Sequence, residues 1–114
     1  MKSKFSTFND GVLWICAPEE AISDFGAVKN TAKKTDLKKI QKLNYHEQSK
    51  RDQDLVFAES QGRTLNLKVK CPLWPKIDTL QQVLIEKTLY SIINLDEDRG
   101  KHVMYIYLEE VRKL

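Results

Sequence analysis

Two histidines and two cysteines are the side chains best suited to bind a metal ion or act in catalysis. His46 and His102 have no second ligand at the short spacing of a zinc motif, and Cys16 and Cys71 are far apart in the sequence. A Cys–His pair would require a chance meeting in the fold. No Ser, Asp and His arrangement stands out either. The sequence therefore predicts no metal, no cofactor and no enzymatic activity.

Two short acidic motifs are similar to metal-binding sequences. Asp24-Phe25-Gly26 spells the kinase triplet, but the chain has neither the His-Arg-Asp loop nor the Gly-rich loop and is too short for a kinase. Asp96-x-Asp98-x-Gly100 is similar to the start of a calcium loop. An EF-hand loop that began at Asp96 would need Gly at position 101 and Glu at position 107, where this chain has Lys101 and Tyr107. We interpret the first motif as a turn or a coincidence and the second as a solvated hairpin loop.

Positive charge is concentrated in one stretch, although the net charge is only +3. Residues 29–51 carry eight basic residues (Lys29, Lys33, Lys34, Lys38, Lys39, Lys42, Lys50 and Arg51). Only Asp36 and Glu47 oppose them, whereas residues 52–114 hold nine basic and ten acidic residues. Such a stretch either contacts nucleic acid or an acidic partner, or forms a solvated loop and strand face.

Aromatic residues offer a second route to nucleic-acid binding, because exposed rings can stack on bases. The candidates are Trp14, Trp74, Tyr45, Tyr90, Tyr105 and Tyr107. They are not interleaved with basic residues along the sequence, as a nucleic-acid face would require. Packing in the core and at interfaces is the favoured interpretation.

Length and composition indicate one globular domain. A chain of 114 residues can bury a single core. With 41% hydrophobic and 31% charged residues it is neither a membrane protein nor wholly disordered. The apolar runs are too short to span a bilayer, and no signal peptide pattern follows Met1. Two cysteines do not make a disulfide framework, so we expect reduced, half-buried thiols in the cytosol.

The first half of the chain predicts two strands separated by a loop. Apolar residues predict a strand over Val12–Cys16, ended by Ala17-Pro18. Residues 19–35 are polar and rich in Lys and Thr, which predicts a mobile loop. A second strand is predicted over Leu37–Gln48, with Leu43 and Tyr45 on one face and room for a bulge near Ile40.

A short helix is predicted between the second and third strands. Ser49 can cap it, with Asp52 completing an acidic variant of the capping box and suiting the helix dipole. Gly62 suits the left-handed position that ends the helix. In the following strand, Leu65, Leu67, Val69 and Cys71 share one face, and Thr64, Asn66, Lys68 and Lys70 share the other.

The last third predicts an antiparallel meander. Pro72 and Pro75 indicate a bend that is not central sheet. Strands over 82–85 and 88–93 flank Glu86-Lys87, a spacing that suits a tight hairpin although the residues are poor for a type I′ turn. A polar loop is predicted over 96–101, followed by a strand over 102–108.

The strand over 102–108 has bulky residues on both faces, so we expect it to be central in a barrel or covered by another subunit. The pattern as a whole predicts a mainly β fold: a small β-barrel or sandwich of five to six antiparallel strands with one short inserted helix. Residues 1–114 are expected to form a single domain.

The order and spacing of residues 36–112 also resemble a known family. The pattern consists of Leu43-x-Tyr45-x-Glu47-x-Ser49-x-Arg51-x-x-Asp54-Leu55-x-Phe57-Ala58-Glu59-x-Gln61-Gly62, then Thr64-Leu65-x-Leu67-Lys68-Val69-Lys70, Thr88-Leu89-Tyr90-x-Ile92, Asp96-x-Asp98-Arg99 and Met104-Tyr105-x-Tyr107-Leu108-Glu109-Glu110-Val111-Arg112. It is similar to the head-closure or head–tail joining (stopper) proteins of long-tailed phages of Gram-positive bacteria. The family tends to carry an Asp-aromatic-Gly loop where Asp24-Phe25-Gly26 stands. Glu86-Lys87 departs from its Asn-Gly-like turn, and residues 29–42 are unusually basic.

The resemblance implies a β-barrel that forms a ring beneath the portal and adaptor rings of the virion. Such a ring closes the DNA exit channel after packaging and offers the surface on which the tail docks. The implied partners are the portal or adaptor ring, tail terminator proteins, further copies of this chain in a dodecameric ring, and packaged double-stranded DNA, with no membrane. Assembly is expected in the host cytoplasm. We also expect neighbouring subunits to satisfy open sheet edges.

Two sets of candidate site residues follow. The candidates for the lumen or DNA are Lys29, Lys33, Lys34, Lys38, Lys39 and Lys42. The candidates for contacts between subunits or rings are Ser49, Arg51, Asp54, Phe57, Tyr105, Tyr107, Glu109 and Arg112. Two alternatives remain: a small β-barrel that binds nucleic acid through the basic segment 29–51, and a small enzyme or toxin fragment.

Overall fold

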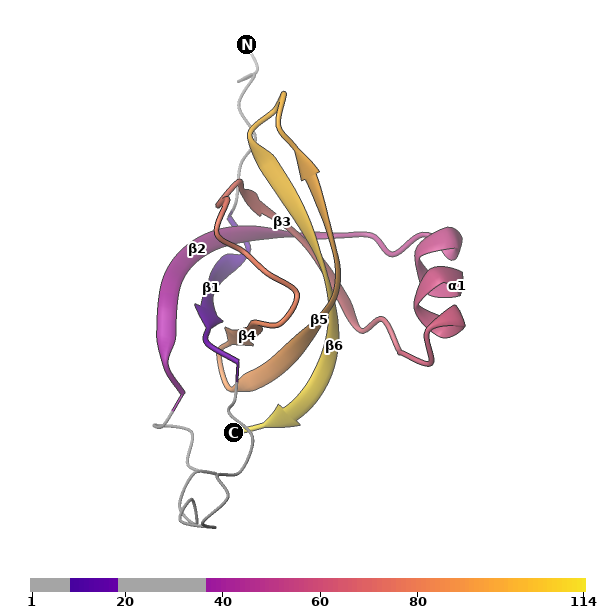
Figure 1. The fold of residues 1–114 in the computed structure, drawn as a ribbon, viewed down its shortest axis with the longest axis horizontal. Helices are drawn as coiled ribbons and strands as arrows, with labels where there is room; N and C mark the ends of the chain where they lie inside the picture. Colours follow the sequence, from indigo (N-terminus) through magenta and orange to yellow (C-terminus); the bar gives the residue numbers. More distant parts are fainter. Residues whose placement is uncertain (1–8, 19–36) are drawn as a thin grey trace.

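A computed structural model describes residues 9–18 and 37–114. Within these residues, six antiparallel strands close into a barrel in the order β1-β2-β3-β6-β5-β4, with one short helix outside it (Figure 1). The elements are β1 (Gly11–Cys16), β2 (Lys39–Gln48), α1 (Asp52–Ser60), β3 (Leu67–Pro72), β4 (Gln82–Ile85), β5 (Thr88–Asp98) and β6 (Val103–Lys113). The predicted mainly β barrel with one helix is confirmed. The predicted mobile loop 19–35, the Asp24-Phe25-Gly26 triplet and Lys29, Lys33 and Lys34 lie outside the described residues.

The barrel closes because β1 pairs with strands on both of its sides. Leu13 lies opposite Leu43 of β2, and Trp14 lies opposite Leu84 of β4. Closure does not pair every strand along its whole length, because β4 lies opposite only Thr88–Ser91 of the longer β5. Residues 92–98 of β5 therefore pair with β6 on one side and with no described strand on the other, and our expectation that neighbouring subunits satisfy open edges stays a prediction.

The barrel interior is filled by alternate residues of the strands. The buried core comprises Leu13, Ile15, Val69, Cys71, Ile77, Val83, Ile85, Ile92, Met104, Ile106 and Leu108. Leu43 and Tyr45 pack against it, as their shared face predicted. Leu65, assigned to the same face as Val69, instead lies in a separate cluster outside the barrel because β3 begins only at Leu67.

Both cysteines are free and fully buried, whereas we expected half-buried thiols, so the predicted extent of burial is wrong. Cys71 lies in the barrel core, where burial raises its pKa to about 12. Cys16 lies in an outer cluster with Leu84 and Leu89, and burial also raises its pKa, although the Lys39 charge opposes this. Both groups are therefore neutral, inert thiols at pH 7.

The predicted bulge in the second strand is present. Ile15 lies opposite Gln41 whereas Cys16 lies opposite Lys39, which leaves Ile40 as the extra residue of β2. Ile40 is largely exposed, as expected for a residue that the ladder leaves unpaired. The strand begins at Lys39 rather than at Leu37.

The β4–β5 hairpin turns through Glu86-Lys87, as predicted, with Ile85 opposite Thr88. Glu86 has a φ of 55°, whereas Lys87 has no positive φ. A type I′ turn requires positive φ at both central residues, so this turn is of another type. The mismatch between Glu-Lys and type I′ chemistry is thereby explained.

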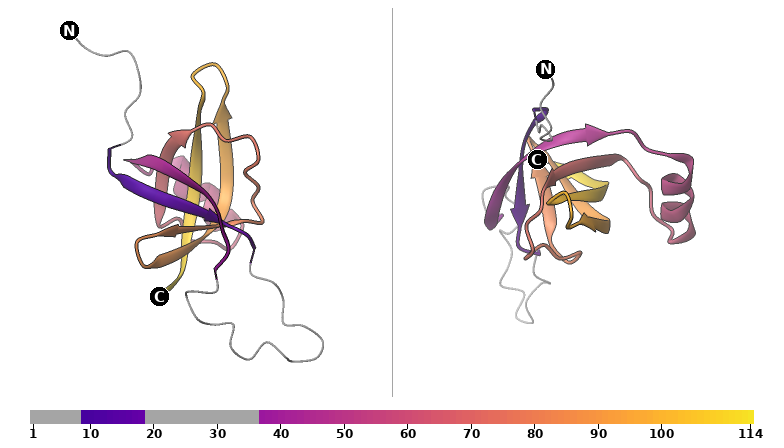
Figure 2. Two further views of the ribbon diagram at one scale, coloured as in Figure 1. Left: turned by 90° about the vertical axis from the view of Figure 1, so that its left-hand side faces the viewer. Right: turned by 90° about the horizontal axis from the view of Figure 1, so that it is seen from above.

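The β5–β6 hairpin is longer than predicted and extends beyond the other strands (Figure 2). Asp96, Glu97 and Asp98 belong to β5 and lie opposite Tyr105, Met104 and Val103. The predicted polar loop 96–101 is confirmed over residues 99–101, which lie in the turn, but is wrong for residues 96–98, because backbone pairing with β6 carries β5 through these acidic residues. The predicted strand 102–108 likewise extends to Lys113.

Candidate interaction site around helix α1

Helix α1 stands outside the barrel, at the end of two arms formed by β2 and β3 (Figures 1 and 2). Its N-cap is Arg51, and the Arg51 backbone N–H donates to Asp54 Oδ2 at 3.0 Å. The predicted cap at Ser49 with Asp52 is wrong, because the Asp54 carboxylate at the third helical position satisfies the cap N–H instead. Ser49 lies in the segment that precedes the helix.

The C-terminal end of α1 matches the prediction. Gly62 has a φ of 70°, its N–H donates to the Glu59 carbonyl, and the Arg63 N–H donates to the Ala58 carbonyl. These two bonds form a Schellman motif, which redirects the chain toward the barrel. Arg63 then forms an ion pair with Glu109 of β6, and the Thr64 N–H donates to Glu109 Oε2 at 3.1 Å.

A buried ion pair fixes α1 to the barrel wall. Lys68 Nζ of β3 lies 3.0 Å from Asp54 Oδ2, and each side chain is only 7% exposed. The same ammonium lies 5.1 Å from the ring centroid of Tyr107 and 5.8 Å from that of Tyr105. A buried ammonium requires a paired anion, and the two rings add cation–π stabilisation.

Few apolar contacts supplement this ion pair. Ala58 of α1 packs in a small cluster with Leu65, Ile93 and Tyr107. At Tyr107 the outer face of β6 is thus covered by the chain's own helix. We had two explanations for the apolar residues on both faces of strand 102–108, and the first, a central place in the barrel, is confirmed because β6 lies between β3 and β5. Tyr107 on its outer face packs against Ala58 of α1 in the same chain.

Three consecutive apolar residues of α1 are exposed, among polar ones. Leu55, Val56 and Phe57 are 37%, 62% and 43% exposed, and only Asp54 and Ala58 of the helix are buried. Isolated exposed apolar residues are normal, but three in a row on a projecting helix form a candidate contact surface.

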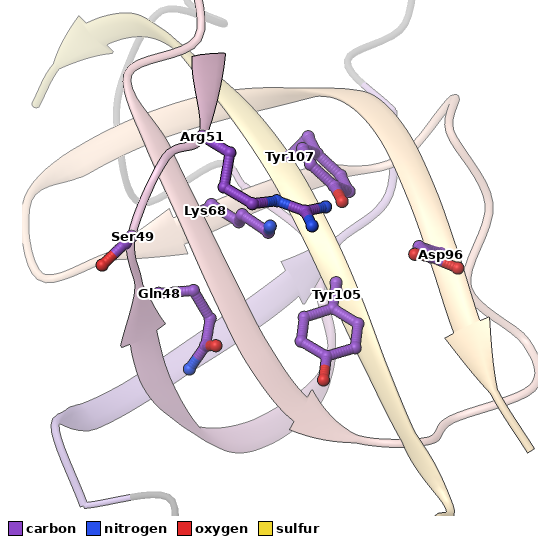
Figure 3. Close-up of a pocket in the computed structure, with 7 residues that line it drawn as sticks. All are labelled: Gln48, Ser49, Arg51, Lys68, Asp96, Tyr105 and Tyr107. Carbon is purple, nitrogen blue, oxygen red and sulfur yellow. The ribbon is translucent and has the colours of Figure 1, made fainter. Parts of the chain in front are cut away.

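A polar pocket of about 430 Å³ lies beside the start of α1 (Figure 3). It is lined by Gln48, Ser49, Arg51, Lys68, Asp96, Tyr105 and Tyr107. Figure 3 shows the Arg51 side chain extending over the pocket toward Tyr107, with Asp96 on a separate strand. Hydrogen-bond donors predominate, and Asp96 supplies a carboxylate. The pocket can therefore hold a polar or charged side chain of a partner.

The structure brings half of the predicted contact residues together. Ser49, Arg51, Tyr105 and Tyr107 line this one pocket, although Tyr107 is nearly buried. The other four occupy separate positions: Asp54 pairs with Lys68, Phe57 is on the exposed side of α1, Glu109 binds Arg63, and Arg112 lies opposite Leu89. Any role of Asp54, Tyr107 and Glu109 in subunit contacts would be indirect, because each is engaged within the chain.

Sequence reasoning missed Lys68, Gln48 and Asp96 as parts of this site. Lys68 does alternate outward from the barrel as predicted, yet α1 covers it. No sequence signal reveals such cover, because the helix reaches β3 only through the tertiary fold. The register of Asp96 against Tyr105 could have placed Asp96 here had β5 been predicted to its full length.

The part of the chain that the structure describes contains neither a cluster of potential metal ligands nor a helix that could cross a membrane. No three His, Cys, Asp or Glu residues within 9–18 and 37–114 are arranged to hold a metal ion. His46 Nδ1 lies 3.2 Å from Asp10 Oδ2. No helix among these residues has the length and apolarity needed to cross a membrane.

The anchoring of α1 is expected to weaken in acid. Burial alone would raise the pKa of Asp54, but hydrogen bonds from the Arg51 N–H and from Lys68 lower it below 3.8. The hydrogen bond from Arg63 likewise lowers the pKa of Glu109 below 4.5. A carboxyl group whose pKa is lower in the folded state stabilises the fold at any pH above its unfolded-state pKa. This stabilisation is lost as the pH falls through the folded-state pKa.

We therefore expect protection of the α1 amides from hydrogen exchange to fall below about pH 4, before the barrel amides lose theirs. Protection factors measured by NMR between pH 7 and pH 3 test this expectation. In the Asp54→Asn variant, the protection of the α1 amides should fall less between pH 7 and pH 3. Simultaneous loss of protection in α1 and the barrel core would contradict it.

No protein-family model matches this chain, and no curated protein matches it in sequence. The resemblance to head-closure proteins therefore stays a prediction from the residues.

Proposed function

We propose that this protein is a structural subunit of a phage head–tail connector. In this role, copies form a ring that closes the DNA exit channel after packaging and offers a docking surface for the tail. The observation that carries the proposal is the polar pocket beside the start of α1, together with the three exposed apolar residues Leu55, Val56 and Phe57 of that helix. The order of residues 36–112 supports the same assignment through its resemblance to head-closure proteins.

The geometry suits contacts that form only in an assembly. Val56 and Phe57 offer apolar area to a neighbour, while Arg51 and Asp96 offer charges of opposite sign that fix its orientation. Three exposed apolar side chains are too few for a stable dimer interface, which typically buries about 1,600 Å² in total. We therefore expect the free chain to be monomeric and to form a ring on a portal–adaptor template, where many weak contacts act together.

In the proposed ring each copy uses different surfaces toward its two neighbours, as a closed ring of identical subunits requires. The surface around α1 would meet one neighbour, and a different surface of the barrel, apart from the lysines, would meet the other. The lysines over 29–42 would face the channel, and twelve copies would surround the DNA. Portal or adaptor and tail terminator proteins are the proposed partners above and below the ring, in the virion.

Electron microscopy of DNA-filled heads tests the proposal. Heads made without this protein should lose DNA and fail to join tails. Val56→Asp with Phe57→Asp should reproduce that defect, because two buried charges would oppose the subunit contact. Leu80→Asp is the matched control, since Leu80 is also exposed but lies in the loop before β4.

Heads that remain full and join tails without the protein would refute the head-closure function. Equal defects from the α1 double variant and from Leu80→Asp would refute the assignment of α1 as the contact surface. Circular dichroism of each purified variant checks that the barrel still folds.

A second candidate is a β-barrel that binds nucleic acid through segment 29–51. The observation that favours it is the clustering of Lys39 and Lys42 at Trp14, which places basic and aromatic side chains together. This candidate predicts tight binding of short DNA by the free chain at physiological salt. It also predicts no effect of the protein on head closure.

A further inference from the structure

The outer surface of β1 and β2 gathers positive charge around one aromatic ring. Trp14 points away from the core, and Lys42 lies directly opposite it across the β1–β2 ladder. Lys39 Nζ lies 4.8 Å from the Trp14 ring centroid, and Lys42 Nζ lies 6.0 Å from it. Although basic and aromatic residues are not interleaved along the chain, strand pairing interleaves them in space. We call this surface (Trp14, Lys39 and Lys42) the Trp14 lysine face.

The charge on the Trp14 lysine face is not neutralised within the described part of the chain. Both lysines are exposed, and neither forms an ion pair with a described acidic residue. Exposed Lys38 adjoins them at the start of β2. The side chains that pack beside Trp14 are apolar, from Leu37, Cys16, Leu84, Leu89 and Leu114.

We propose that the Trp14 lysine face binds the phosphate backbone of double-stranded DNA without sequence preference. Lysine ammoniums bind phosphates as compact point charges without a fixed bidentate geometry, which suits contact with a DNA backbone of any sequence. Lys39 and Lys42 lie along one strand, so their charges form a short row that can follow a polyanion. Because both ammoniums are held near the indole, less side-chain freedom is lost when phosphate binds.

The face is suited to the backbone rather than to the bases. The ammoniums occupy the approach to the indole ring, which hinders stacking of an unpaired base on that side.

This inference deepens the DNA-contacting part of the proposed function and does not depend on ring formation. Two phosphate contacts per copy give weak binding by one chain, and a ring would multiply them around the channel. Heads that close normally while the isolated chain binds DNA would refute only head closure. Failure of the isolated chain to bind DNA through this face would refute only the present inference.

The test measures binding of a fluorescent 20-base-pair DNA duplex (about two helical turns) to the isolated chain by anisotropy. Lys39→Glu with Lys42→Glu is expected to weaken binding at least about tenfold at about 50 mM salt and to reduce the slope of log affinity against log salt by about two. Lys76→Glu with Lys101→Glu is the control, because it changes the net charge equally at exposed loop positions.

Trp14 itself provides the second measurement. In a Trp74→Phe background, Trp14 is the only tryptophan of the sequence. DNA should then change its fluorescence, because bound phosphates change the charge close to the indole ring. Equal weakening by the two charge-reversed variants would show a general charge effect and overturn the proposal. Unchanged Trp14 fluorescence at saturating DNA would also overturn it.

Discussion

Replacing Lys68 by alanine is expected to lower the free energy of unfolding by about 3 kcal/mol. The substitution leaves the Asp54 carboxylate without its ammonium partner in a site where that side chain is only 7% exposed. It also removes the cation from the rings of Tyr105 and Tyr107. Chemical denaturation measured by circular dichroism gives the change in unfolding free energy.

Lys70→Ala is the matched control, because Lys70 is two residues away on the same strand and less buried. It should change stability by at most about 0.5 kcal/mol. Lys68→Met combined with Asp54→Asn should be more stable than Lys68→Ala, because it removes both charges and leaves an amide oxygen to accept the Arg51 N–H. Equal effects of Lys68→Ala and Lys70→Ala would show that the ion pair does not stabilise the fold.

Ile106→Ala is expected to have an effect of similar size, a loss of about 3 to 4 kcal/mol in unfolding free energy. Ile106 is fully buried and lies between Val69 of β3 and Leu95 of β5, so its truncation leaves a cavity that the closed barrel cannot collapse to fill. Thermal unfolding followed by calorimetry should show a lower Tm.

Val111→Ala on the same strand is the control, since Val111 is largely exposed and should lose at most about 0.5 kcal/mol. Ile106→Val removes a single methylene group and should cost about 1 kcal/mol. A smaller loss for Ile106→Ala than for Ile106→Val would contradict the assignment of Ile106 to the centre of the core.

The two substitutions test different connections within one molecule. Ile106 belongs to the barrel core, whereas Lys68 connects the barrel to α1. Undocking of α1 would move Arg51 and Phe57 relative to the barrel and would change the proposed contact surface. We therefore expect Lys68→Ala to impair the proposed ring assembly even at temperatures where the barrel remains folded.

Most strands of this fold were predictable from the sequence. Alternation in Leu13–Ile15, Leu43–Tyr45 and Leu67–Cys71 determined which side chains enter the core, because a strand repeats every two residues. The hairpin at Glu86-Lys87 and the helix end at Gly62 were also predictable, because the spacing of neighbouring residues indicates both. The acidic run Asp96–Asp98 was not, since its strand conformation comes from pairing with β6 rather than from its own composition.

The candidate site was predictable only in part. Ser49, Arg51, Tyr105 and Tyr107 were named from the sequence as separate contact residues, and the structure places them around one pocket. Gln48, Lys68 and Asp96 complete that pocket from other positions along the chain. Their contribution depends on where α1 comes to lie and on the register of β5 with β6, neither of which a local pattern encodes.

The sequence by itself determined the absence of a recognisable catalytic motif, the β class of the fold, the inserted helix and the faces of most strands. These follow from side-chain type and short-range periodicity, which act between neighbours along the chain. Only the tertiary structure decided that the barrel closes, that Lys68 is buried against Asp54 and that two lysines meet at Trp14. Those features join residues distant in sequence, and their energies depend on burial and distance, which exist only once the chain has folded.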